Sequence, residues 1–434
     1  MKTRLLTFVQ NNKEKGFVLT DQGLVSGINF LLSILLARFL GVELFGIFSL
    51  TWMVIIFSSS VQQAFLTAPL FALTAKKKNT ACWFAQLLSI QTILSIFSFL
   101  LVFVLLEITC YFQPHWEYTG VNLTLSLLVA VYLFNDFNRR ILFVQHVPEK
   151  VLAIDFFGYA LQPLFIVGLY MFDTLNLVSV LASILSAHCI SLGYIMLVIR
   201  PKFQLKGIGS TTKKLWTYSR FLVATSLLQW SSANYIILFA ASVLGPAAIG
   251  AIRVSQNLMG VLNVLFQAME NIIPARSAEA LLQGGLTELG NYMQRITLQL
   301  TLPVVVFLGG IAIFHRQIMT VVYGVEYLPY SFILLAFCGI YVFVFLGTLL
   351  RFVIRTLEYN QLIFISYVLT TVFSLIAGKA LASYYGLAGV MSGIAGTQLI
   401  SFISFITLLK IKVKWNFKLF MFFRQSKSQS HEWG

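Results

Sequence analysis

One predicted helical face in the second half of the sequence carries polar side chains along its whole length. It runs from Arg253 to Pro274 at alternating steps of three and four residues, the repeat that brings side chains to one side of a helix. An arginine and carboxamides in such a row can bind an anion and hydrogen-bond hydroxyl groups. We expect a water-filled cavity there, lined by Arg253, Gln256, Asn263 and Gln267.

The segments that open each half of the chain show a shorter version of the same pattern. Asn29 and Gln229 lie within polar rows of helical spacing, so we expect both to face the same cavity. The serines and threonines of these rows are equally suited to hydrogen bonds between helices, with no solute involved.

Titratable residues inside apolar segments are the second group that could take part in chemistry. A charge in a bilayer is costly unless it has a function or a partner. Glu270 shares the polar face of Arg253, and Asp21 and Asp155 lie near segment ends; all three are candidate carriers of a coupling ion. The four cysteines and five histidines show no ligand spacing, so we expect no metal, no cofactor and no catalytic residue. Arginines at segment ends could form a basic mouth for a phosphorylated headgroup or could serve topology alone: Arg139, Arg140, Arg220, Arg276 and Arg351.

Composition indicates which elements must position these residues. Of 434 residues, 58% are apolar and 10% are charged, whereas soluble domains have about 25% charged residues. The net charge of +15 comes from basic residues beside apolar runs, which argues for membrane topology and against nucleic acid. Segments long enough to span a bilayer are predicted near residues 17–40, 44–70, 83–107, 119–145, 151–172, 175–199, 218–241, 247–275, 292–314, 328–354, 361–383 and 386–410.

The basic residues also predict an orientation. If the N-terminus is cytoplasmic, 26 of the 30 lysines and arginines fall on the cytoplasmic side, so both termini are expected there. The connections are short, and the chain contains no Gly-x4-Gly-Lys-Ser/Thr phosphate loop. Energy for any transport step would therefore come from an ion gradient or from consumption of the product.

An internal repeat divides the twelve segments into two halves. Ala37-Arg38-Phe39-Leu40-Gly41-x4-Gly46 recurs as Ala241-Ser242-Val243-Leu244-Gly245-x4-Gly250, an offset of 204 residues. Glycine at these points suits a tight hairpin between two helices. We expect an all-α polytopic membrane protein with two six-helix bundles, 1–199 and 218–410, a cytoplasmic linker 200–217 and a basic cytoplasmic tail 411–434.

The stretch from Asp21 to Leu50 carries the motif around Ala37-Arg38-Phe39-Leu40-Gly41-x3-Phe45-Gly46. It resembles the opening of polysaccharide biosynthesis transporters, the O-antigen repeat-unit flippases called Wzx. Tyr385-Gly386-Leu387-Ala388-Gly389-Val390 is similar to the hairpin between their last two helices. The resemblance implies the fold of the multidrug/oligosaccharidyl-lipid/polysaccharide exporters, with a central cavity that opens alternately to either side.

It also implies a substrate, an undecaprenyl-diphosphate-linked oligosaccharide carried across the bacterial inner membrane for lipopolysaccharide biosynthesis. Expected partners are this glycan, membrane lipids and the polymerase and chain-length proteins of the same pathway, and the chain is expected to be a monomer. Two alternatives stay open. One is an ion-coupled multidrug exporter of the same superfamily; the other is a membrane glycan polymerase or ligase, which usually needs a large outward loop.

Overall fold

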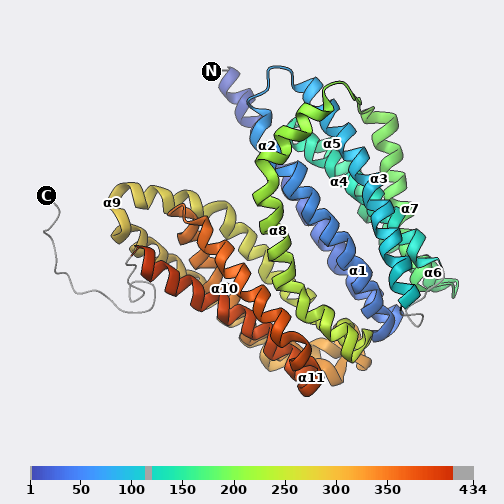
Figure 1. Cartoon of the computed structure of the whole chain (residues 1–434), viewed down its shortest axis with the longest axis vertical. Helices are drawn as coiled ribbons and strands as arrows, with labels where there is room; N and C mark the ends of the chain where they lie inside the picture. The colour runs from blue at the N-terminus through green and yellow to red at the C-terminus, as the bar shows by residue number, and fades with distance from the viewer. Residues whose placement is uncertain (1, 113–119, 414–434) are drawn as a thin grey trace, which may run out of the picture. The chain divides into compact units, whose positions relative to one another are not determined.

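The computed structural model describes residues 2–112 and 120–413, apart from the side chains of residues 2–15, 18, 19, 271 and 413. Helices make up almost all of this part of the chain, and it contains no strand (Figure 1). The first half comprises α1 (Lys2–Gln62), η1 (Gln63–Thr67), α2 (Ala68–Thr74), α3 (Thr80–Phe112), α4 (Val121–Val144), α5 (Pro148–Asp155), η3 (Phe156–Ala160), α6 (Leu161–Met171), α7 (Leu177–Tyr194) and η4 (Ile195–Ile199). The second comprises α8 (Ile208–Leu244), α9 (Pro246–Tyr323), η5 (Val325–Tyr330), α10 (Ser331–Thr356) and α11 (Asn360–Val413).

Nine helices in the described residues are long and apolar enough to cross a membrane. Three of them, α1, α9 and α11, contain a glycine with non-helical backbone angles, and each is long enough for two spans. Counting each bent helix twice gives about twelve spans, in agreement with the sequence prediction. The basic tail predicted for 411–434 lies almost entirely outside the described residues.

The bend of α1 at Gly41 is a reversal of the chain. Asp21 and Gln62 both bind α4, at Arg139 and at the carbonyl of Leu133. A straight helix would place Asp21 and Gln62 roughly 60 Å apart, whereas their partners are separated by about 9 Å along α4. Gly41 has φ 74° and ψ 174°, and Gly245, at the repeat-related position, has φ 82° and ψ 178°. The glycine hairpins predicted from the repeat are therefore confirmed.

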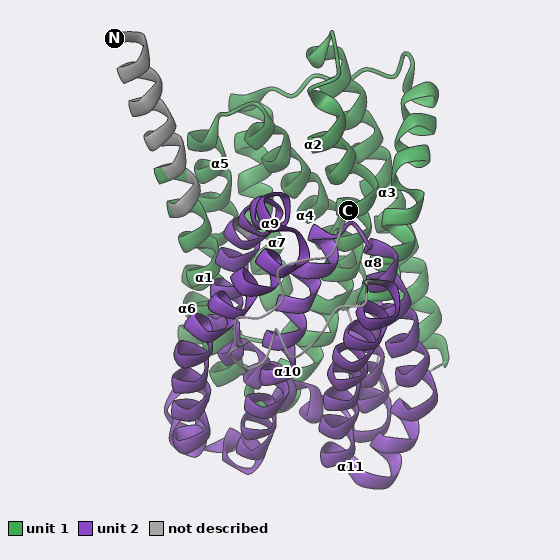
Figure 2. Ribbon diagram, turned by 90° about the vertical axis from the view of Figure 1, so that its left-hand side faces the viewer, with its two compact units in different colours: residues 1–230 green, residues 231–434 purple. Residues whose placement is uncertain are grey.

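The chain forms two compact units, residues 1–230 and 231–434 (Figure 2). Their boundary falls inside α8, beyond the linker on which the sequence-based division rested. The core of the first unit includes Leu66, Leu87, Phe137 and Leu215, all fully buried.

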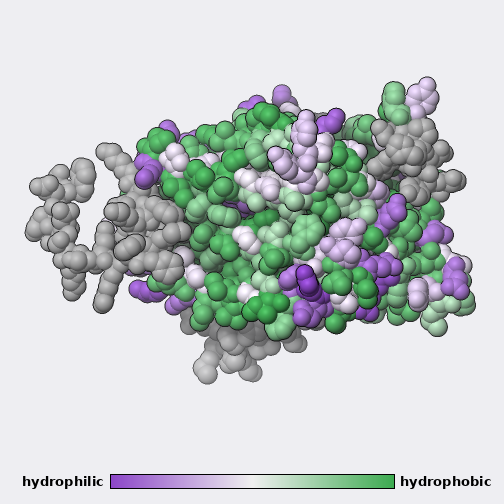
Figure 3. All heavy atoms as spheres, turned by 90° about the horizontal axis from the view of Figure 1, so that it is seen from below, coloured by the Kyte–Doolittle hydropathy of each residue, from purple (hydrophilic) through white to green (hydrophobic). Residues whose placement is uncertain are grey.

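Apolar residues also cover most of the surface seen in Figure 3. On α3, Ile93, Ile96, Leu100 and Val104 are all exposed at helical spacing, forming an apolar stripe on its outer side. A face of this kind suits lipid, and with the nine apolar helices found in the described residues it makes the chain a multi-pass membrane protein.

Candidate functional site

Three charged side chains meet inside the first unit. The Arg139 guanidinium donates through Nη2 to Asp21 at 2.8 Å and through Nε to Asp155 at 2.5 Å. The arginine side chain is 16% exposed and each aspartate 2%. One guanidinium therefore serves two carboxyl groups. With both carboxyl groups ionised the triad carries one negative charge, and the uptake of one proton would make it neutral.

Local helix geometry places the triad. Asp155 is the last residue of α5, and the chain then forms the wider π-helix η3. Such single turns are frequent at functional sites because they shift the side chains that follow. Gly158 lets α7 approach: a Cβ atom there would lie 3.3 Å from His188 Nδ1. The triad thus joins α1, α4 and α5, while η3 packs against α7.

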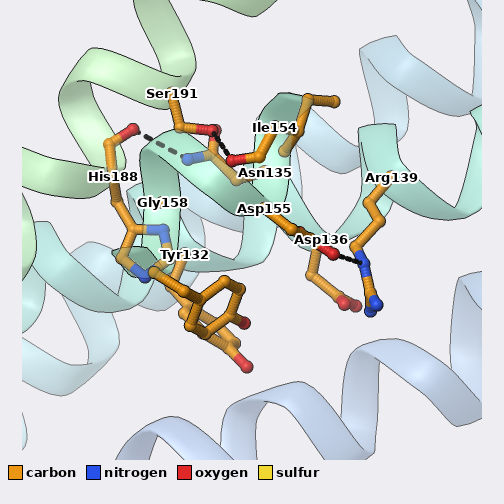
Figure 4. Close-up of a pocket in the computed structure, with 10 residues that line it drawn as sticks. Tyr132, Asn135, Asp136, Arg139, Ile154, Asp155, Gly158, His188 and Ser191 are labelled. Carbon is orange, nitrogen blue, oxygen red and sulfur yellow. Dashed lines mark hydrogen bonds and ion pairs between the residues drawn. The ribbon is translucent and has the colours of Figure 1, made fainter. Parts of the chain in front are cut away.

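A small pocket lies next to the triad, between α4, α5, η3 and α7 (Figure 4). Asn135 donates to the carbonyl of His188 at 2.8 Å, and Ser191 donates to the carbonyl of Ile154 at 3.0 Å. The His188 ring packs edge-on against Tyr132 and Tyr159. The pocket is lined by Tyr132, Asn135, Asp136, Arg139, Ile154, Asp155, Gly158, Tyr159, His188 and Ser191.

Several buried acceptors around this pocket have no donor among the described residues. They are Asp21 Oδ1, Asn135 Oδ1 and Asp136 Oδ2. Buried polar atoms in native proteins are nearly always satisfied, by protein or by ordered water. A region that holds more acceptors than donors can take up a proton or a water molecule.

The second unit contains a different kind of charge. Arg253, on α9, donates to the amide oxygens of Gln256 at 2.8 Å and Asn234 at 3.4 Å. Within the described residues its guanidinium is bound by these amides and by no carboxylate. Arg253 and Gln256 are half-buried, whereas Asn263 and Gln267 are exposed and Asn263 also hydrogen-bonds Tyr341. The predicted polar face of α9 is therefore real, with a half-buried cation at its beginning.

Glu270, predicted on the same helical face as Arg253, forms an ion pair with Arg355 on α10, at 3.6 Å. Both side chains are about half exposed, at 48% and 47%, so the pair is solvated.

The remaining predicted residues are spread over both units. Asn29 is half-buried and Gln229 exposed, each in the first unit. Arg139 was expected at a cytoplasmic mouth, yet it belongs to the buried triad, and Arg140 pairs with Asp136 at 3.3 Å. Arg351 bonds Thr348, Arg220 stacks on Phe221, and Arg276 is exposed.

Sequence reasoning missed most of the pocket, including Tyr132, Asn135, Asp136, Tyr159 and Ser191. A signal was present in the fourth span, where Asn135-Asp136-x2-Arg139-Arg140 interrupts an apolar segment. A cluster of that kind is costly in lipid and calls for partners on neighbouring helices.

Comparison with known proteins places this architecture in a family. The family model described as polysaccharide biosynthesis protein matches residues 35–332. The chain belongs to this family. A search of curated protein sequences gives no match. The resemblance drawn from the opening segment is thus confirmed.

Solved structures with the same fold are transporters of the MOP superfamily. An inward-facing multidrug resistance MATE family transporter superimposes with a TM-score of 0.70 at 14% identity, covering 90% of this chain and 96% of that chain. A MOP superfamily transporter from Pyrococcus furiosus gives 0.60 at 15% identity, covering 92% and 96%. The lipid II flippase MurJ, in an inward closed conformation, gives 0.61 at 13% identity, covering 93% and 88%. At these identities the likeness concerns the fold.

Proposed function

We propose that the protein is a flippase that moves an undecaprenyl-diphosphate-linked oligosaccharide from the cytoplasmic to the outer leaflet of a bacterial inner membrane. Membership of the polysaccharide biosynthesis family supports a glycan substrate, and the fold shared with MurJ supports a lipid-linked one. A chain made almost entirely of apolar helices suits transport better than glycan polymerisation or ligation.

Arg253 is the observation on which this proposal rests. A half-buried guanidinium held by neutral amides has a fixed orientation and an uncompensated charge. An anionic group of the substrate would compensate that charge. The diphosphate and any acidic sugar have that charge. Gln256, Asn263 and Gln267 continue the face and offer amide groups to sugar hydroxyls. Asn29 and Gln229 are proposed to bind substrate hydroxyl groups within the first unit.

The first test is the complementation of a flippase-deficient strain. Arg253→Ala is expected to abolish complementation with normal expression and insertion, and Arg253→Lys to rescue it partly, because lysine keeps the charge but loses the fork of donors. Arg316→Ala is the matched control, since Arg316 is an exposed arginine near the other end of α9. Full activity of Arg253→Ala would remove the anion-binding role.

Transport also needs an energy source, and we propose that Asp21 and Asp155 couple it to an ion gradient. Because one guanidinium balances only one of the two carboxylate charges, the triad can take up one further positive charge. Glu270 is less suited, because its pair with Arg355 is half exposed. The coupling ion is proposed to be a proton or sodium.

An ion-coupled multidrug exporter is the second candidate, favoured by the TM-score of 0.70 with the MATE family transporter. A drug-susceptibility assay separates the two functions. A flippase restores surface glycan to the deficient strain without changing drug tolerance, whereas an exporter raises tolerance and leaves the glycan absent.

A further inference from the structure

The segment that joins the two halves combines basic and apolar side chains in an unusual way. Residues 200–220 include six lysines and arginines and no acid. All six basic residues are exposed: Arg200, Lys202, Lys206, Lys213, Lys214 and Arg220. Between them, Leu205 is 69% exposed and Trp216 54%. Exposed apolar and cationic groups that alternate in this way are typical of surfaces that lie in a membrane interface.

This segment is firmly attached to the first unit. Gln204 N donates to the carbonyl of Ala85 and to Ser89 Oγ, and Gln86 bonds the carbonyl of Lys206 and the hydroxyl of Thr211. Its backbone turns at Gly207, which has a φ of +81°. The segment is therefore held on α3, where it has a fixed orientation.

The first turns of α8 show which side is presented outward. Thr211, Leu215 and Ser219 are buried, with Leu215 in the core of the first unit. Lys213, Trp216 and Arg220 occupy the opposite face at helical spacing, and all three are exposed. One face of the helix thus anchors it to the protein, and the other offers two cations around an indole ring.

The length of α8 places these residues at the level of lipid headgroups. A helix of 37 residues is about 55 Å long, whereas the hydrocarbon core is about 30 Å thick. A helix of this length extends beyond the hydrocarbon, and its basic first turns are the end expected to do so, with Trp216 at the interface that aromatic residues favour. Figure 1 shows the linker at the same end of the first unit as α2. Three more lysines, 76–78, follow α2 in the sequence.

We infer that this segment is a binding surface for anionic phospholipid headgroups. The lysines and arginines contact the phosphates, while Trp216 and Leu205 insert at the boundary with the acyl chains. The complementary charge favours anionic over zwitterionic lipids. This inference goes beyond the proposed flippase function and does not depend on it.

Native mass spectrometry of the purified full-length protein provides the test, with equal amounts of phosphatidylglycerol and phosphatidylcholine added in detergent. The wild type is expected to retain phosphatidylglycerol in excess. Lys213→Gln/Lys214→Gln is expected to reduce that excess on the order of tenfold at low ionic strength, because each cation near the headgroups adds to the attraction.

Lys410→Gln/Lys412→Gln is the matched control, because it removes the same charge from an exposed helix end in the second unit. It is expected to keep the preference, and the thermal unfolding of both double variants should match the wild type. Equal losses in both pairs, or no preference in the wild type, would overturn the inference. Displacement of phosphatidylglycerol by equimolar undecaprenyl phosphate, but not by phosphatidylcholine, would assign the surface to the substrate instead.

Discussion

The two units differ in how their buried or half-buried arginines are partnered. The first unit contains a compensated arginine, Arg139, between two aspartates. The second contains an arginine whose partners are amides, Arg253. The former suits a step in which charge is balanced internally, and the latter suits an anionic ligand.

The triad gives a prediction about coupling. Asp21→Asn and Asp155→Asn are each expected to abolish gradient-dependent transport in proteoliposomes, because neither asparagine can exchange a proton with its neighbour. Glu270→Gln is the control and is expected to retain gradient dependence. Should transport remain gradient-dependent with all three residues replaced, coupling through carboxylates is excluded.

The same residues give a prediction about stability. The double variant Asp21→Asn/Asp155→Asn leaves the Arg139 charge buried and uncompensated, which is expected to cost about 3–5 kcal/mol. Adding Arg139→Gln removes that charge and is expected to recover most of the loss, as measured by thermal unfolding of the purified protein. A triple variant no more stable than the double one would mean that packing, and not charge, holds α1, α4 and α5 together.

Groups of residues could be predicted from the sequence only where their members lie close together along the chain. The α9 stripe was found from sequence because its members share one helix and follow its period. The triad was not, since Asp21 and Arg139 are 118 residues apart and meet only through the packing of α1 on α4. Each aspartate was recognised as a candidate, but their common partner could not be.

At the scale of helices, a few glycines determine where one span ends and the next begins. Hydropathy predicted about twelve spans because a backbone in lipid must satisfy its hydrogen bonds within its own helix. It could not predict π-helical turns such as η3, which arise where tertiary contacts outweigh regular hydrogen bonding. Gly41 and Gly245 were predictable, because the repeat marked both positions.

These hairpins are open to a direct test. The angles of Gly41 and Gly245 lie in a region that is essentially restricted to glycine, so Gly41→Ala and Gly245→Ala are each expected to destabilise the protein by about 1–3 kcal/mol. Gly27→Ala is the control, since Gly27 lies in regular helix and a Cβ atom added there would meet no other atom within 4 Å. Thermal unfolding would contradict this if all three variants behaved alike.

Topology is the property that belongs to the whole molecule. Because 26 of the 30 basic residues fall on one side of the predicted topology, reporters fused after Lys77, within residues 200–217 or after Lys414 are expected to report the cytoplasm. Reporters near Trp116 or Glu326 are expected to report the exterior. An exterior signal from the linker would contradict the arrangement of two six-helix halves.

The cation of the triad, Arg139, is covalently part of α4, and this affects which other cations can bind the two aspartates. A tethered group has an effective concentration set by geometry, commonly in the millimolar range or above, whatever the composition of the surrounding solution. A dissolved metal cation would have to displace Arg139 from both Asp21 and Asp155 against that constant local supply. The guanidinium charge also opposes the binding of a proton, but a proton bonds to a single carboxyl oxygen and needs no further ligand positions. Of the two proposed coupling ions, the arrangement therefore favours the proton over sodium.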